Sequence, residues 1–553
     1  MATRSINATL DRFILDAGTE ITYLGMSLWK GAPSDLIRAY RVTPGLNGYV
    51  IFTIEKSFGV LDMEIYQEDA YNSLSPLTGY SKYFSVLKAG KLKGAIGVNV
   101  RYDKTYIVLV RFETYQNAFY SGKVRIEDPL YLAAGATPAL DLQFANNQSL
   151  VDVVSKNNLV TFTRASTGTY VDSTGTLQTA AVNAPRFTYD PVSGQSLGLL
   201  VEEQRTNSIR NNTMVGAVAG TPGTLPTNWT TVPQGLTQTV VGSGIINGVS
   251  YVDIKFTGTT TGAGGIQVKP DGNAGVITAT SSQAWTLSAW VSIIAGSTAN
   301  TSGQRFIINE YSAGPTYLRT AVAATNVLSS GSILTRVSGA ITTGASTTII
   351  EPIIILDVAS GAAIDITLRI GMPQLEQGAF ATSVIPTTSA AATRNADVAS
   401  ITGTAFSSWY RQDEGTVFAE TQLQSTAART VAGFDINDNS TNNRIVFRAF
   451  TSSSVDQVVI RSGSTTIFSA TNVAPAPTTA IRKTSAGYKA NDFAYTAAGQ
   501  AGYTGTSGAV PVSPTQILIG YEQGPIGYLG GTIRRLVYWG SRLSNNTLQA
   551  ITQ

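Results

Sequence analysis

The chain has 553 residues, of which 43% are hydrophobic and only 13% are charged, with 38 Lys and Arg against 35 Asp and Glu. A formal charge of +3 spread over this length creates no field that would attract nucleic acid or an anionic membrane, so we expect no nucleic-acid partner. The absence of Cys and His excludes disulfides, thiol nucleophiles, Ser-His-Asp relays and Cys/His zinc sites. We expect no cofactor and no metal.

The N-terminal region differs in composition from the rest. Residues 1–130 hold 28 of the charged residues and 18 of the aromatic ones, a density that predicts a domain boundary near residue 130. Runs at Tyr49–Ile54 and Tyr106–Phe112 are β-branched and aromatic, which predicts buried strands. The run Ser34–Tyr40 could form one short helix.

Two features bear on targeting. The start of the chain carries Arg4, Asp11 and Arg12 where a signal peptide needs an apolar run, so no export signal is expected. The most apolar stretch, 349–358, is too short and too interrupted by polar residues to span a membrane. We therefore expect no membrane insertion.

From residue 131 onward, short alternating segments are separated by Gly, Asn, Ser and Thr turns, a pattern typical of antiparallel sandwiches. The predicted fold class is mainly β, with tandem antiparallel β-sandwiches after an N-terminal β-rich domain. The stretch 386–392 is the predicted linker. At the C-terminus, Ser544 is placed to cap a short helix whose Leu548 and Ile551 face inward.

Three regions resemble known families. The runs VTFTRASTGTYVD at 160–172 and GLLVEEQRTN at 198–207 resemble a module of bacteriophage tail fibres, tailspikes and other virion structural proteins. The central strand Trp285–Val291 and the closing run QLEQGAFATS at 374–383 resemble a carbohydrate-binding-module jelly roll. Residues from about 395 to 553, with strands at Gly415–Glu420 and Ile533–Trp539, are similar to concanavalin-like or laminin-G-like lectin sandwiches.

The composition break and these resemblances together predict four parts: a virion-attachment domain at 1–130, a connector module at 131–207, a jelly roll at 208–388 and a lectin sandwich at 389–553. They also imply a phage virion fibre or spike, made in the host cytoplasm, that forms a homotrimer. Its partners would be other virion proteins and host surface polysaccharide. The N-terminal domain resembles no named family, and the glycan, the host, the copy number and a tail or head location stay open.

The adjacent Glu202 and Glu203 are the obvious candidates for catalysis. Neighbours on a strand point to opposite faces, so the two carboxylates cannot flank one glycosidic bond. A buried pairing of glutamate with arginine would explain this run without catalysis. We expect a binding protein and not an enzyme. The alternatives are a carboxylate-dependent polysaccharide depolymerase and an architectural head fibre, decoration or baseplate protein that binds no glycan.

The loop Asp435–Ser440 begins like a calcium loop, with oxygen acceptors at alternate positions. An EF-hand needs Gly and Glu where this chain has Ser440 and Val446, which favours a polar hairpin turn. A calcium ion at Asp435–Asn439 stays open as the alternative.

Sugars stack on flat aromatic rings, so exposed rings mark candidate binding sites. Alternation along the strand 285–293 places Trp285 in the core and Trp290, with Thr286 and Ser288, on a polar face, although a neighbouring loop could cover Trp290. We place the predicted glycan-binding face on the C-terminal sandwich, with Trp290 as the alternative. The residues of that predicted face are Trp409, Tyr410, Tyr521 and Tyr528.

Overall fold

The structure, a computed structural model, describes strands β1 to β9 of the first 128 residues and then residues 129–553 apart from 273–276, 331–333, 428–429, 451–454, 472–477 and 525–526. The described residues are mostly in antiparallel β-sheets, which confirms the predicted fold class. The chain divides into two compact units, Met1–Thr137 and Pro138–Gln553. In the described part of the chain, no helix is long and apolar enough to cross a membrane.

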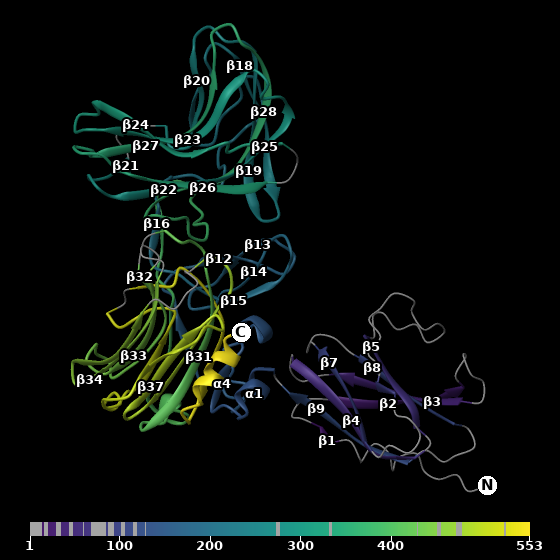
Figure 1. Cartoon of the computed structure of the whole chain (residues 1–553). Coiled ribbons are helices and arrows are strands. Elements are labelled where there is room, and N and C mark those ends of the chain that lie inside the picture. Colours follow the sequence, from purple (N-terminus) through teal and green to yellow (C-terminus); the bar gives the residue numbers. More distant parts are fainter. Residues whose placement is uncertain are drawn as a thin grey trace. The chain divides into compact units, whose positions relative to one another are not determined.

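The N-terminal unit contains two sheets, with strand orders β1-β9-β4-β7 and β2-β3-β8-β5-β6 (Figure 1). The strands are β1 (Ile14–Leu15), β2 (Glu20–Leu28), β3 (Asp35–Thr43), β4 (Gly48–Phe58), β5 (Val60–Gln67), β6 (Ser85–Val86), β7 (Lys93–Val100), β8 (Tyr106–Glu113) and β9 (Phe119–Glu127). Both predicted strands are confirmed, as parts of β4 and β8.

The predicted helix at 34–40 is wrong, because Asp35 to Tyr40 lie in strand β3. Ser34 lies outside the described residues. That strand pairs antiparallel with β2 on one side and with β8 on the other. A seven-residue segment has too little intrinsic helical stability to compete with two ladders of backbone hydrogen bonds.

The jelly roll consists of two sheets, with the main strand orders β17-β20-β27-β23-β24 and β18-β19-β28-β22-β25. Apolar side chains from the facing surfaces, among them Leu287, Ile308, Ile354 and Leu368, are fully buried between the two sheets. The strands are β17 (Thr230–Val232), β18 (Thr237–Ile246), β19 (Val249–Thr259), β20 (Gly264–Lys269), β21 (Ile277–Thr278), β22 (Ala284–Gly296), β23 (Thr301–Tyr311), β24 (Tyr317–Thr325), β25 (Ser329–Ser330), β26 (Thr335–Thr342), β27 (Ile349–Val358) and β28 (Ala363–Gln377).

The C-terminal sandwich packs a sheet ordered β14-β15-β40-β31-β36-β37-β38 with one ordered β11-β30-β39-β32-β33-β34-β35. Its later strands are β29 (Ala392–Arg394), β30 (Val398–Thr402), β31 (Glu414–Leu423), β32 (Thr430–Asn437), β33 (Arg444–Phe450), β34 (Val455–Ser462), β35 (Thr465–Thr471), β36 (Arg482–Lys489), β37 (Asp492–Ala497), β38 (Tyr503–Gly505), β39 (Gln516–Ile519) and β40 (Gly531–Trp539). The strands predicted at 415–420 and 533–539 are confirmed within β31 and β40.

Four short helices complete the described fold: α1 (Pro129–Ala134), α2 (Phe144–Asn147), α3 (Gly403–Ser407) and α4 (Asn545–Ile551). The predicted cap of α4 is confirmed, because the backbone N–H of Thr547 donates to the Ser544 hydroxyl at 3.2 Å. Leu548 and Ile551 are buried, as expected for the inward face of this helix.

Residues 138–207 contribute strands to the C-terminal sandwich. Strands β10, β14 and β15 join the sheet of β40, β11 pairs with β30, and β16 pairs with β29. The jelly roll is therefore an insertion between strands of one sandwich, and the four-part division stays a prediction. The seven strands are β10 (Leu140–Leu142), β11 (Thr161–Thr163), β12 (Gly168–Val171), β13 (Leu177–Ala180), β14 (Phe187–Tyr189), β15 (Ser196–Val201) and β16 (Arg205–Asn207).

The predicted linker, 386–392, lies where the chain passes from the jelly roll back to the C-terminal sandwich, and it is fixed there by hydrogen bonds. Thr387 is buried, and its backbone N–H donates to the side-chain oxygen of Asn212 at 2.7 Å. The Thr387 hydroxyl in turn accepts from the backbone N–H of Asn212 at 3.0 Å. These reciprocal hydrogen bonds hold together the two segments by which the chain enters and leaves the jelly roll.

Candidate functional site

Trp409 and Tyr410, two residues of the predicted face, lie in an aromatic cluster of the C-terminal sandwich. Trp409 is 6% exposed, and its ring centroid lies 4.9 Å from those of Phe406 and Tyr538. Tyr410 stacks on Phe406 at 4.7 Å, and burial raises the pKa of its phenol well above the usual value. The enclosed ring of Trp409 offers no face to a sugar, and Tyr410 is half-buried against the same core, which corrects the expectation that these rings are exposed.

Tyr521 and Tyr528, the other two residues, form a packed pair. Their rings are stacked with centroids 5.3 Å apart; Tyr521 is 5% exposed and Tyr528 is half-buried. The neighbouring Glu522 is also buried and accepts from Arg444 and Arg448. The carboxylate of Glu522, the hydrogen-bond acceptor beside Tyr521, is thus already engaged by arginines within the protein. Tyr521 itself is not the exposed ring that we expected.

Trp290 is half-buried, and its ring is covered. The Arg336 guanidinium lies 4.9 Å from the ring centroid, and Val249, Met372 and Val384 form the apolar cluster against which the ring packs. The polar face of this strand is also buried. There the Ser288 hydroxyl accepts a hydrogen bond from Arg336 at 3.0 Å. Covering by a neighbouring segment, the alternative considered for Trp290, is therefore what the structure shows.

Glu202 has the structural role that the sequence favoured. Its carboxylate lies 2.8 Å from Arg186 and 3.0 Å from Arg394, and it accepts from the backbone and hydroxyl of Ser383 at 2.8 and 2.6 Å. Asp397 pairs with Arg186 and with Arg164. We call these residues the junction network, because they connect the connector strands, the end of the jelly roll and the return to the C-terminal sandwich.

Every charged side chain of the junction network is at most 1% exposed. Burial alone would raise the pKa of Glu202, but Arg394, Arg186 and the bonds from Ser383 lower it to about 2. The group is therefore held as a carboxylate whose oxygens are occupied by donors. This arrangement connects the strands to one another. The oxygens of Glu202 are occupied by protein donors and are not available to a substrate.

The Asp435–Ser440 segment forms the end of the β32–β33 hairpin, as the polar-turn interpretation predicted. Asp435 is buried and accepts from Arg444 at 3.2 Å and from the backbone of Gln523 at 2.9 Å. Asp438 accepts from Ser440 within the turn. Among the residues that the structure describes, no three acidic side chains gather in a group that could hold a metal ion.

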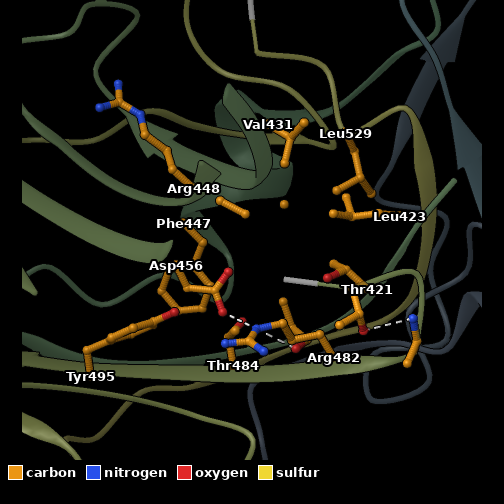
Figure 2. Close-up of a pocket in the computed structure, with 15 residues that line it drawn as sticks. Thr421, Leu423, Val431, Phe447, Arg448, Asp456, Arg482, Thr484, Tyr495 and Leu529 are labelled. Atoms are coloured by element: carbon orange, nitrogen blue, oxygen red, sulfur yellow. Dashed lines mark hydrogen bonds and ion pairs between the residues drawn. The ribbon is translucent and has the colours of Figure 1, made fainter. Parts of the chain in front are cut away.

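A cleft opens in the C-terminal sandwich between the side chains that Figure 2 labels. Asp456 pairs there with Arg482, and burial raises the pKa of Asp456 to about 6 although the guanidinium opposes the rise. The cleft has a volume of about 30 Å³, which is room for about one water molecule. A sugar ring does not fit into it.

A different surface has the composition that sugar binding needs. On the jelly-roll sheet, Phe306, Ile308 and Glu310 of β23 point to the core side, so the alternating residues Asn309 and Tyr311 lie on the outer face. Strand β23 pairs with β24 on one side and with β27 on the other, and β27 pairs in turn with β20. These neighbouring strands add further polar and aromatic side chains to the same face. We call this surface the tyrosine face; it consists of Lys269, Asn309, Tyr311, Tyr317, Thr320 and Glu351.

The side chains of the tyrosine face are held by one another. Lys269 Nζ donates to both oxygens of Glu351 at 3.1 and 3.2 Å, and the Tyr311 hydroxyl donates to Glu351 at 3.0 Å. Burial, and then the charge of Glu351, raise the pKa of Tyr311 to about 12, so its phenol stays a donor. The face therefore has a fixed hydrogen-bonding pattern.

Tyr317 supplies the exposed ring of this face. It is 55% exposed, and its ring meets that of Tyr311 edge to face with centroids 5.9 Å apart. Its hydroxyl lies 2.9 Å from that of Thr320, which donates to the Asn309 side chain at 2.6 Å. An accessible ring bordered by hydroxyl and amide groups can stack on a sugar and hydrogen-bond its hydroxyls.

Sequence reasoning missed the tyrosine face, although its signal is present. The run Phe306–Tyr311 reads FIINEY, so Asn309 and Tyr311 share one face of the strand, and Tyr317 follows after a short turn. In the sequence, the polar residues of the 349–358 stretch count only against a membrane span, whereas the structure places Glu351 beside Asn309 of the neighbouring strand. Only the pairing of β20, β27, β23 and β24 brings these residues together.

No protein-family model matches the chain, and no curated protein matches it. Among solved structures, a Ruminococcus gnavus IT-sialidase CBM40 bound to alpha2,6 sialyllactose is 16% identical, covering 26% of this chain and 85% of its own, with a TM-score of 0.23. The CBM22-1 xylan-binding domain of Paenibacillus barcinonensis Xyn10C is 12% identical, covering 32% and 94%, with a TM-score of 0.20. Mouse laminin alpha1 domains LG4-5 are 10% identical, covering 54% and 90%, with a TM-score of 0.19.

Proposed function

We propose that the chain binds glycan through the tyrosine face of its jelly roll. The observation that carries this proposal is the 55% exposed ring of Tyr317 beside a fixed set of polar groups. The charges of Lys269 and Glu351 balance each other there, so the face suits a ligand that is rich in hydroxyl groups and carries no strong charge. Low overall charge agrees with recognition through many weak, repeated contacts.

The test uses an array of bacterial surface polysaccharides with the full-length chain and a Tyr317→Ala variant. Loss of a stacked ring should cost about 1–3 kcal/mol, a roughly 5- to 150-fold weaker retention, by analogy with stacking on nucleobases. Tyr503→Ala is the matched control, because Tyr503 is 43% exposed but belongs to the C-terminal sandwich. Normal retention by Tyr317→Ala would reject the tyrosine face.

The same experiment separates the competing functions. Release of reducing ends from a retained polysaccharide would indicate a depolymerase, whereas retention without release supports a binding protein. A chain that retains no polysaccharide would favour a purely architectural role. We propose binding without catalysis, since the buried carboxylates of the junction network are all engaged by arginines.

We also propose that this glycan-binding unit belongs to a phage virion fibre or spike. The support is the resemblance of residues 160–207 to virion modules and the separation of unit Met1–Thr137 from unit Pro138–Gln553. In this arrangement the N-terminal unit attaches to other virion proteins, and three copies multiply weak glycan contacts. Native mass measurement of the full-length chain tests the homotrimer, and a stable monomer would contradict it.

A further inference from the structure

The outer face of the jelly-roll sheet continues past the tyrosine face toward the other end of strand β23. Arg305 lies four residues before Asn309 on this strand, so both side chains are on the same side of the sheet. Arg305 is opposite Thr325 of β24, and Asp357 lies on the neighbouring strand β27. We call these three residues, Arg305, Thr325 and Asp357, the far end of the face.

The stretch between the tyrosine face and the far end is apolar. Ile307 of β23 packs with Ile353 and Ile355 of β27 in a cluster that is separate from the core between the two sheets. These three side chains are at most 6% exposed, so they form the floor of the face and are not themselves available to a ligand. Val322, which is opposite Ile307 on the edge strand β24, is 46% exposed and supplies the accessible apolar group of this stretch.

The far end carries a second ion pair that solvent reaches. The Arg305 guanidinium donates to both oxygens of Asp357 at 2.8 and 2.6 Å, and the two side chains are 32% and 24% exposed. These bonds use two of the five N–H groups of the guanidinium, which leaves donors for the hydroxyls of a ligand. The two charges balance each other, as those of Lys269 and Glu351 do at the tyrosine face. Both ends of the face therefore suit neutral, hydroxyl-rich groups.

The distance between the two ends sets the length of a ligand that contacts both. Tyr311, which is opposite Tyr317, and Arg305 are six residues apart on β23, a separation of about 20 Å at the usual rise of a strand. A single sugar ring is far shorter than this separation. A ligand that stacks on Tyr317 and also reaches Arg305 must therefore consist of several sugar units in a row.

We propose that the jelly roll binds an internal stretch of a neutral polysaccharide chain, laid along β23 and β24 from the tyrosine face to the far end. The ring of Tyr317 stacks on one sugar unit, Val322 contacts the apolar side of a unit further along, and the Arg305 guanidinium donates to hydroxyls at the other end. This inference rests on the proposed glycan binding of the tyrosine face and specifies its ligand as a chain of several units, as distinct from one terminal sugar.

A competition experiment with fragments of defined length tests the proposal. Each polysaccharide of the array is partially hydrolysed and separated into fragments of one to six sugar units, which compete for retention of the full-length chain on the parent polysaccharide. Fragments of five or six units should compete at about tenfold lower concentration than single units, because only they reach the far end. Arg305→Ala should remove this advantage of long fragments, whereas Tyr317→Ala should weaken competition at every length.

Two further variants make the result specific. Val322→Asn changes an exposed side chain of the apolar stretch and should also weaken the long fragments alone, so it remains informative if Arg305→Ala does not fold. Lys255→Ala is the matched control, because it removes an ion pair with Asp365 from the other sheet of the jelly roll and should change competition at no length.

The outcomes separate this proposal from the one on which it rests. Equal competition by short and long fragments, or an advantage of long fragments that survives in both Arg305→Ala and Val322→Asn, would overturn the binding of an extended chain. Either result would leave glycan binding at the tyrosine face in place if Tyr317→Ala still weakens competition. Absence of retention on every polysaccharide, or retention unaffected by Tyr317→Ala, would reject the tyrosine face and the extended chain together.

Discussion

In the unit Pro138–Gln553, the rings predicted to bind glycan in the C-terminal sandwich and the ring of Tyr317 in the jelly roll are placed in opposite ways. In the C-terminal sandwich, Trp409 and Tyr521 are 6% and 5% exposed and pack against other rings. In the jelly roll, Tyr317 is 55% exposed on the outer side of a sheet. Aromatic residues in the sequence therefore mark hydrophobic cores as readily as binding surfaces. Which of the two a given ring belongs to depends on whether its side of the strand is buried or exposed.

The difference has a local cause. Trp409 follows helix α3, whose Phe406 is buried, so the turn after this helix carries Trp409 and Tyr410 back onto the same core. Tyr317 begins strand β24 just after a turn, and a register shift between Glu310 and Tyr311 precedes that turn. A bulge of this kind redirects side chains at the edge of a sheet.

The largest expected effect breaks the inward arrangement. Trp409→Ala removes a buried ring and should cost about 3–5 kcal/mol of stability, because the aromatic cluster cannot close over the cavity. Calorimetry of the full-length chain should show a lower transition temperature for the C-terminal sandwich. If the melting curve matches that of the unchanged protein, Trp409 is not part of the core.

A second prediction concerns the junction network that connects the two sandwiches. The pKa of Glu202 is about 2 in the folded protein against an ordinary 4.5, so its stabilising contribution is complete above pH 4.5 and is lost as the pH falls toward 2. That difference corresponds to about 3 kcal/mol. Melting temperatures measured across this range should fall steeply with acid.

Ser383→Ala sharpens the acid experiment. It removes the hydroxyl that donates to Glu202 at 2.6 Å, so the folded-state pKa of Glu202 should rise; the stability that acid removes should be smaller, and its loss should be complete at a higher pH. The arginine pairs remain, which keeps the variant foldable. An identical pH profile for both proteins would show that Glu202 does not govern the acid sensitivity.

The smallest expected effect touches the outward arrangement. Tyr311→Phe keeps the ring but removes the hydroxyl that donates to Glu351 at 3.0 Å, and Lys269 still pairs with that carboxylate. We expect a loss of about 1 kcal/mol in unfolding free energy and a modest loss of polysaccharide retention. Denaturant titration and the polysaccharide array measure the two; a larger loss than for Trp409→Ala would reverse the comparison.

Much of the fold was predictable because its signals are local. β-branched and aromatic residues between turns identified the strand at 106–112, and the Ser544 cap identified the last helix. The strands at 415–420 and 533–539 followed from the resemblance to lectin sandwiches. The opposite directions of Glu202 and Glu203 also follow from strand geometry alone. What failed locally was the helix at 34–40, where pairing with two neighbouring strands overrides a weak tendency.

The sequence by itself determined the composition of the surface, the β class and the chemistry that a chain without Cys and His cannot perform. The tertiary structure alone decided which rings face outward and which distant segments meet. Glu351 bonds to Lys269 and Tyr311 of neighbouring strands, and Glu202 pairs with Arg186 and Arg394, which lie far from each other in the sequence. Periodicity reveals the two faces of a strand, whereas burial depends on what the rest of the chain packs against each face.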